Sequence, residues 1–280
     1  MRYCGLRFAG ALVLAAGSTL GGMACAAEPA GTVVLAVGNV TDQAADGNRR
    51  TLHDGDQIYS GDSLSTGRGA YLDLDFADGG RILLRPGTRF QIEHYRYAAA
   101  APVQTAAPAT ARSEVHESAF FRLIKGGLRA ISGLIGHVTR ADYRLDTPVA
   151  TIGIRGTEYD VRYCNNDCGD QVGAAGALQN GLYTGVDRGA VAVSNRAGEI
   201  ITTAGQFMYV HDARSRIRLL QGRPAVLQHM RLPERYRQLE EKRMKNTGRR
   251  RSEEQRRLEM RLRLREELRH RIRRGPGGWQ

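Results

Sequence analysis

Short runs of alternating or β-branched residues, each closed by a turn sequence, constrain the fold of this chain more than any other feature. The clearest run, Tyr71–Phe76, reads Y-L-D-L-D-F, so that Leu72, Leu74 and Phe76 share one face. Because successive side chains of a strand point to opposite faces, this pattern predicts a half-buried β-strand. A D-G-G turn sequence follows at residues 78–80, as expected where one strand ends and the next begins.

Such runs and turns recur every 8–12 residues, helped by 34 glycines, and the sequence shows no long helical pattern before about residue 225. We therefore predict an all-β domain over residues 28–215, built as a sandwich, a roll or a short β-solenoid. Gly126 and Gly127 interrupt one apolar run, which indicates a hairpin there. An Ala/Pro-rich stretch at about 98–118 has too little bulk to pack and is interpreted as a loop or linker.

The net charge of +12 is concentrated in one segment. Residues 28–230 hold 21 basic and 21 acidic side chains, whereas residues 231–274 hold 18 basic and 8 acidic ones. The sequence around Ser252 resembles a helix N-cap, so residues 225–274 are predicted to form a basic helical tail, alone or in a coiled coil, before a flexible end at 275–280. Its cations are spread around the predicted helix. This argues against a membrane-surface helix and leaves two interpretations, a solvated helix or a tail that binds polyanions.

Residues 1–27 have the features of a secretory signal peptide. Arg2 and Arg7 precede a short apolar run, and an A-x-A-like site follows at 24–26. The run is too short for a transmembrane helix, so no membrane span is predicted. We expect a periplasmic or secreted protein, and export removes nucleic acid as a partner. A lipoprotein acylated at Cys25 is an alternative.

Export also bears on the cysteines. Removing the signal leaves the C-N-N-D-C pair Cys164 and Cys168, which in an oxidising compartment predicts a disulfide closing a small loop. A zinc site would need further Cys or His ligands at suitable spacing, and none follows. The seven histidines form no metal-binding or catalytic motif, and the aspartates around residues 54–78 do not match a calcium loop. We therefore expect no cofactor, no metal and no enzymatic activity.

Several linked motifs resemble the FecR domain. Residues 55–90 contain G-D-x-I, T-G-x-x-x-A-x-L, F-x-D-G-G and L-x-P-x-T-x-F in that order, and Asp146–Ala150 and residues 154–159 (I-R-G-T-E-Y) continue the series. The resemblance spans roughly residues 31–210 and implies an envelope-side all-β domain that binds or relays rather than catalyses. Name-giving members sit in the inner membrane, control an iron-uptake sigma factor and sense an outer-membrane receptor. This chain has an export signal where their cytoplasmic region would be.

We therefore expect a non-catalytic binding or scaffolding module whose partner is an envelope protein or an anionic envelope polymer or lipid. A component of an envelope or iron-responsive signalling pathway is the alternative function. The motif residues are interpreted as structural rather than as a site, although Arg155 is singled out as a buried arginine with Glu158 or Asp160 as its partner. These motif residues are Gly61, Asp62, Asp78, Gly79, Pro148, Arg155, Gly156 and Thr157.

Overall fold

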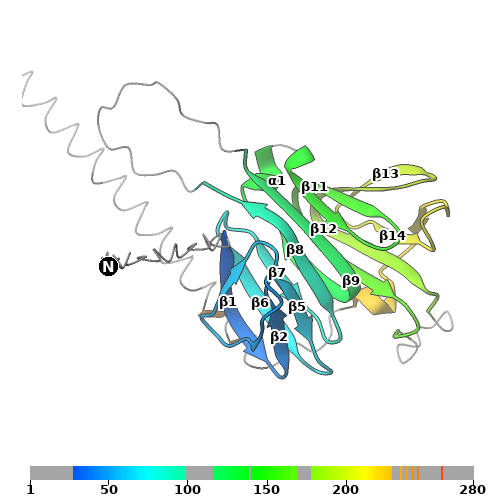
Figure 1. Cartoon of the computed structure of the whole chain (residues 1–280). Coiled ribbons are helices and arrows are strands. Elements are labelled where there is room, and N and C mark those ends of the chain that lie inside the picture. Colours follow the sequence, from blue (N-terminus) through cyan, green and yellow to red (C-terminus); the bar gives the residue numbers. More distant parts are fainter. Residues whose placement is uncertain are drawn as a thin grey trace, which may run out of the picture.

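The computed structural model describes residues 28–98, 116–138, 140–168 and 178–228, together with seven separate residues of the C-terminal tail. Within these ranges the regular secondary structure is almost entirely β-strand, which confirms the predicted all-β class (Figure 1). No helix among the described residues is long and apolar enough to cross a membrane.

Eight strands precede the Ala/Pro-rich stretch, and seven strands and three short helical turns follow it. The first eight are β1 (Pro29–Val37), β2 (Val40–Gln43), β3 (Arg49–Thr51), β4 (Gln57–Tyr59), β5 (Ser63–Thr66), β6 (Tyr71–Phe76), β7 (Arg81–Leu84) and β8 (Arg89–Arg96). The rest are β9 (Ser118–Ile131), α1 (Ile135–Val138), η1 (Arg140–Asp142), β10 (Tyr143–Asp146), β11 (Thr151–Cys164), β12 (Gly181–Asn195), β13 (Gly198–Thr203), β14 (Phe207–Val210), β15 (Arg218–Leu220) and η2 (Ala225–Leu227).

All fifteen strands belong to one continuous, strongly bent sheet. Strand β9 lies at its centre: its first part pairs with β8 and, in parallel, with β10, and its last part pairs with β7 and β11. Strands β11 and β12 likewise change neighbours along their length. The long strands therefore join the β1–β7 region to the β10–β15 region, as Figure 1 shows.

Strand β6 forms where the alternating sequence predicts it, but it is more buried than expected. Leu72, Leu74 and Phe76 enter the main core. On the opposite face Tyr71 packs in a small second cluster with Leu35 of β1 and Leu83 of β7. The strand is therefore covered on both faces because its two neighbours in the sheet contribute apolar side chains there.

The predicted hairpin at Gly126 and Gly127 is wrong. Strand β9 runs through both glycines without reversing, and Gly126 adopts a φ of +88°. A Cβ atom at Gly126 would lie 2.5 Å from the Thr88 Cα, so the glycine permits a local bend and a close approach of two backbones. The Gly-Gly pair therefore bends one strand instead of joining two.

A second bend lies where β11 and β12 are paired, at the R-G-T motif. The register shifts between Arg155 and Glu158, and Gly156 and Gly189 face each other with φ of +58° and +79°. Thr157 fixes this bulge: its Oγ1 donates to the Ala190 carbonyl at 2.7 Å and accepts from the Arg155 N–H at 3.1 Å. The motif is thus a β-bulge at which β11 changes neighbours.

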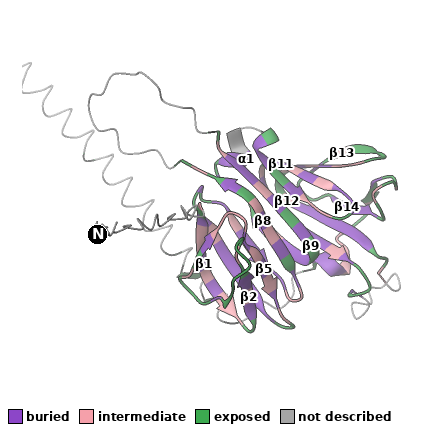
Figure 2. Ribbon diagram, viewed as in Figure 1, coloured by how far each residue is buried: buried purple, intermediate pink, exposed green. Residues whose placement is uncertain are grey.

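Buried residues line most strands of the bent sheet, as Figure 2 shows. The main core includes an aromatic group with Phe76, Tyr95 and Phe121. A smaller core lies beneath residues 221–228, which we call the C-terminal strap. There Val226 and Leu227 pack with the cysteine loop and with side chains of β12 and β14. Residues of the C-terminal strap therefore pack against the β-domain.

Three predicted segments lie outside the described residues: the signal peptide at 1–27, the flexible end at 275–280 and most of the insertion at 98–118. The insertion joins two strands that pair as far as Arg96 and Ser118. In the tail the structure describes only Glu234, Arg237, Gln238, Glu241, Lys242, Lys245 and Met260, all exposed. These separate residues do not establish the predicted basic C-terminal helix.

Candidate partner-binding face

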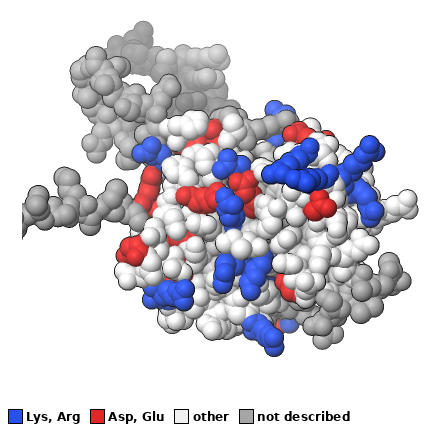
Figure 3. Space-filling view, turned by 45° about the vertical axis from the view of Figure 1, so that its right-hand side comes forward, with Lys and Arg blue, Asp and Glu red and all other residues white. Residues whose placement is uncertain are grey.

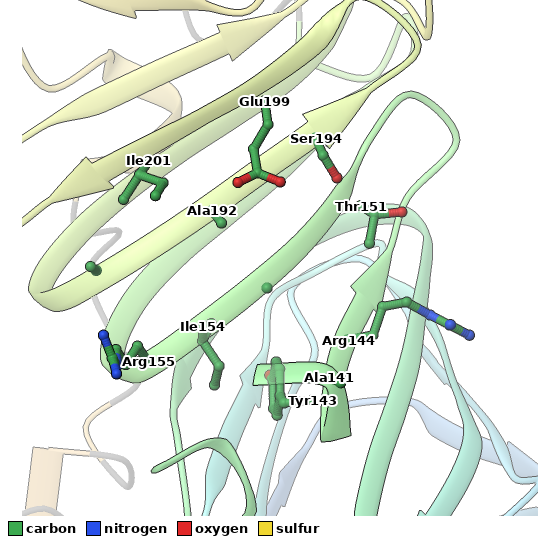
Figure 4. Close-up of a pocket in the computed structure, with 12 residues that line it drawn as sticks. Ala141, Tyr143, Arg144, Thr151, Ile154, Arg155, Ala192, Ser194, Glu199 and Ile201 are labelled. Atoms are coloured by element: carbon green, nitrogen blue, oxygen red, sulfur yellow. The ribbon is translucent and has the colours of Figure 1, made fainter. Parts of the chain in front are cut away.

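A groove of about 320 Å³ lies on the outer face of β10, β11, β12 and β13 (Figure 4). Its floor consists of small side chains because the register aligns those of β11 and β12, and the larger Ile201 of β13 borders them. Gly153 of β11 pairs with Ala192 of β12, which pairs with Ile201 of β13. The alternate residues of β11 and β12, such as Ile152 and Val191, point into the core and are fully buried.

Charged side chains lie at opposite ends of the groove. Arg155 is at one end, and Glu199 lies beside Ser194 at the other (Figure 4). At the β10 side the Arg144 guanidinium lies 4.6 Å from the Phe120 ring centroid, and its Nε is 2.9 Å from Asp146 Oδ2. The face therefore combines an apolar floor with charges of both signs, which suits recognition of an extended polypeptide.

Strand β13 forms one border of this face and is an edge strand. Among the described strands it pairs only with β12, and its central residue Ile201 leaves 52% of its surface exposed. An exposed edge strand can accept a further strand from another chain.

Sequence reasoning did not identify this groove. Two short stretches carried a signal: T-I-G-I-R at 151–155 and A-V-A-V-S at 190–194, where small or polar residues alternate with β-branched ones. Each pattern indicates a strand with one buried face and one face of small side chains. Only the register of the folded sheet places the two small faces side by side.

The predicted disulfide is present. Cys164 and Cys168 are bonded, with 5.5 Å between their Cα atoms. Both are buried beside the C-terminal strap, and the Arg162 Nε donates to Cys168 Sγ at 3.3 Å. The bridge thus closes the end of β11 over a buried arginine, away from the groove.

Asp78 and Gly79 form the turn between β6 and β7. Gly79 has a φ of +82°. The buried Asp78 carboxylate accepts hydrogen bonds from the Gly80 N–H at 3.0 Å and the Tyr95 hydroxyl at 3.0 Å. It also accepts the Ile135 N–H at 3.3 Å, so this turn connects to the start of α1.

Gly61 and Asp62 lie in the turn between β4 and β5. Gly61 has a φ of +95°, and Asp62 is buried and accepts the Tyr59 N–H at 2.8 Å. Pro148 is exposed in the turn from β10 to β11. There Thr147 Oγ1 donates to the Ala150 carbonyl at 2.6 Å.

The expectation of a buried Arg155 is wrong, because its side chain is exposed at the groove. Glu158 and Asp160 pair with other arginines, which come from distant parts of the chain. Asp160 contacts Arg85, and its Oδ2 lies 2.8 Å from Arg129 Nη1 and 3.3 Å from Arg223 Nη1. Sequence distance was misleading because the β-bulge after Arg155 shifts the register, and from Glu158 onward β11 takes β9 as its neighbour, which places Asp160 opposite Arg129.

These groups form a six-membered ion-pair cluster, which we call the arginine cluster: Arg85, Arg129, Arg223, Glu158, Asp160 and Asp187. Its three cations and three carboxylates balance. The Asp160 side chain is only 1% exposed, and the C-terminal strap covers the cluster, with Arg223 Nη1 donating to the Leu227 carbonyl at 3.0 Å. Elsewhere on the surface acidic and basic side chains are interspersed, as Figure 3 shows for one face.

Comparison with protein families places a FecR family domain (FecR protein) in this chain, at residues 62–172. The matched range begins at Asp62 and contains β5–β11 and the disulfide. It includes the β10 and β11 side of the groove, whereas the β12 and β13 side lies beyond it. No curated protein matches the chain significantly.

Two solved structures of a putative anti-sigma factor from Parabacteroides distasonis ATCC 8503 align with 57% of this chain and 59% of theirs, at 14% identity and a TM-score of 0.38. This chain therefore matches little more than half of their length. A cell surface anchoring domain aligns at 27% identity over 22% of this chain and 82% of that domain, with a TM-score of 0.22.

Proposed function

We propose that this chain is a non-catalytic binding module in an envelope signal-transduction pathway, and that a partner protein docks on the groove face of β10–β13. The observation that carries the proposal is the FecR family domain at residues 62–172, because the domain resemblance implies binding and relay. The groove supplies a surface on which such binding can occur.

The chemistry of the groove supports binding over catalysis. Among the described residues that line it, Glu199 is the single carboxylate, accompanied by Arg144 and Arg155. Hydrolysis of a glycosidic bond generally needs two facing carboxyl groups. The groove instead offers small floor residues, an exposed Ile201 and charges at opposite ends, which would hold a partner by shape and by electrostatic complementarity.

We further propose a periplasmic location after removal of residues 1–27, with the +10 segment at 231–274 docking on an anionic envelope surface. In this arrangement the β-domain selects the partner protein and the tail adds local attachment. Deleting residues 231–280 should then reduce envelope association at low salt while leaving the partner in pull-downs.

The groove can be blocked without disturbing the backbone. A Cβ atom added at Gly153 would meet nothing within 4 Å, so Gly153→Leu should fold and fill the floor. Gly222→Leu is the matched control, because Gly222 is exposed, also has open space at its Cβ position and lies outside the groove. Both proteins should show the same unfolding midpoint as the parent chain.

The experiment is cross-linking and pull-down from the envelope fraction, with transcript profiling of a deletion strain complemented by each variant. We expect the parent chain and Gly222→Leu to recover the same partner and to restore transcription, and Gly153→Leu to do neither. Recovery of the partner by all three proteins would exclude the groove as the docking face. An unchanged transcript profile on deletion would overturn the signalling role.

A further inference from the structure

Two buried carboxyl groups lie together beneath the β2–β3 hairpin. Asp42 belongs to β2 and Asp62 precedes β5, and each residue is only 1% exposed. Strands β2 and β5 pair directly, and the guanidinium group of Arg50 lies within 4 Å of both carboxyl groups. A buried ionised carboxylate requires a compensating partner. The number of cations and hydrogen-bond donors nearby therefore decides whether both carboxyl groups are ionised.

The surroundings of Asp42 and Asp62 provide too few cations and hydrogen-bond donors for two ionised carboxylates. Among the described residues, Arg50 of β3 is the one cation in contact with them, with its Nε 2.9 Å from Asp42 Oδ2 and its Nη2 3.8 Å from Asp62 Oδ2. Asp62 Oδ2 also accepts the Tyr59 N–H. Asp42 Oδ1 is buried and receives no hydrogen bond from the described residues when both acids are ionised.

We propose that Asp42 and Asp62 form a proton-binding site, in which Asp62 carries a proton that it donates to the Asp42 carboxylate. The shared proton supplies the donor that Asp42 Oδ1 otherwise lacks. It also leaves one net negative charge facing the one positive charge of Arg50. Paired acids that share a proton behave as one unit, because two adjacent like charges cannot both be accommodated in a buried site.

The surroundings agree with this arrangement. Burial raises the pKa of Asp62 from 3.8 to about 6, the Tyr59 N–H lowers it, and the Asp42 carboxylate raises it further. Burial also raises the pKa of Asp42, although the Arg50 guanidinium opposes the rise. Three further charged residues of the described chain lie nearby. Asp56 acts on Arg50 and lies 3.7 Å from the exposed His53 ring. Arg49 and Arg89 line the same cavity as Asp42 and Arg50.

Loss of the proton should act on the β2–β3 hairpin. Strand β3 is exposed at all three residues, and Arg50 attaches it to the body through Asp42 and through the Gln57 carbonyl. Ionisation of Asp62 would place two carboxylates against one guanidinium and weaken this attachment. The hairpin also forms a wall of a polar cavity of about 570 Å³ on the outer face of β2, β3, β5 and β8, so its attachment governs the shape of that surface.

The sign of the pH effect follows from the raised pKa. A folded-state pKa above the unfolded value means that the folded protein binds more protons between the two values, so its stability falls as pH rises from about 4 to about 6 and then levels off. Asp62→Asn should remove this component. The asparagine amide can donate to Asp42 Oδ1 permanently while its carbonyl accepts the Tyr59 N–H.

The experiment uses the mature chain in urea unfolding from pH 4.5 to 7.5, with the Tyr59 amide shift followed by NMR. Because the Tyr59 N–H donates to Asp62, we expect its chemical shift to change with a midpoint near pH 6 in the parent chain. The shift should stay constant in Asp62→Asn. The folding equilibrium constant of Asp62→Asn relative to the parent should rise at least tenfold between the two ends of the pH range, because one pKa unit corresponds to a factor of ten.

Glu199→Gln, which removes an exposed carboxylate, is the matched control and should show no such rise. A parent Tyr59 amide that does not titrate between pH 5 and 7.5 would overturn the proposal. A ratio of the two equilibrium constants that is independent of pH would also overturn it. If Asp62→Asn does not fold, the pH dependence of the Tyr59 amide shift in the parent chain still tests the proton-binding site. The groove variants are compared at one constant pH. Failure of the docking proposal would therefore not affect the test of the proton-binding site.

Discussion

Two buried acidic clusters in the described part of this protein differ in how their charge is balanced. In the arginine cluster three carboxylates face three guanidinium groups, contributed by Arg85 just after β7, by β9 and by the C-terminal strap. In the Asp42–Asp62 pair two carboxyl groups face only Arg50, whose side chain is 41% exposed. Both clusters connect different strands, yet only the first has as many cations as carboxyl groups.

The difference shows that burial alone does not decide the state of a carboxyl group. Asp160 is as buried as Asp62, but three arginines contact it. Asp62 accepts one backbone N–H, and its nearest guanidinium nitrogen, on Arg50, lies 3.8 Å away. Where cations are sufficient, buried acids serve as ion pairs, and where they are scarce, a proton takes the place of the missing cation.

The largest effect on stability is expected when the balanced arginine cluster is disrupted. Asp160→Asn should lower the unfolding free energy by about 3–5 kcal/mol, since it leaves the buried Arg85 without its carboxylate. Urea denaturation of the mature chain measures the effect. Asp187→Asn is the comparison variant: its side chain is 23% exposed, so its loss should cost less. Equal effects at both positions would show that burial of the cluster is unimportant.

The disulfide provides the next test, because its loop lies beside the arginine cluster. Replacing both Cys164 and Cys168 by serine should cost about 2 kcal/mol, the value expected when a very short loop loses its cross-link. The difference in unfolding free energy between oxidised parent and double variant measures this cost. Reducing agent should destabilise the parent to the level of the variant and leave the variant unchanged. A variant as stable as the parent would contradict the expected role.

The smallest effect is expected at the exposed cation of the acidic pair. Arg50→Gln should lower stability by about 1 kcal/mol at pH 7.5, as for a partly exposed ion pair. The loss should shrink at pH 4.5, where added protons compensate for the missing cation. Unfolding curves at the two pH values test this, with Arg49→Gln on the same exposed strand as the control. A loss that grows on acidification would contradict the shared-proton arrangement.

The all-β fold and many strands could be predicted from the sequence, because alternation and turn residues are local signals. Strand β6 and the disulfide lie where expected. The Gly126–Gly127 bend was mistaken for a hairpin, since a glycine pair permits both and only the approach of Thr88 distinguishes them. The choice depends on a contact far away in sequence.

The groove and the ion pairs could not be predicted from the sequence for the same reason. Arg85 and Asp160 are 75 residues apart, and nothing in either local sequence indicates the other. The proximity of Arg155 to Glu158 and Asp160 in sequence favoured the wrong partner. The groove requires the registers of four strands at once, whereas sequence periodicity reports only which face of each strand is apolar.

The exchange of neighbours along β9, β11 and β12 has a consequence for how the chain could be divided. A cut in the connection between β8 and β9 would separate two fragments, and the first would lose the strand that pairs with both β7 and β8. Neither fragment would then contain a complete sheet. Co-expressed halves should therefore be recovered together or not at all, which makes this connection a natural place for a split reporter of the folded state.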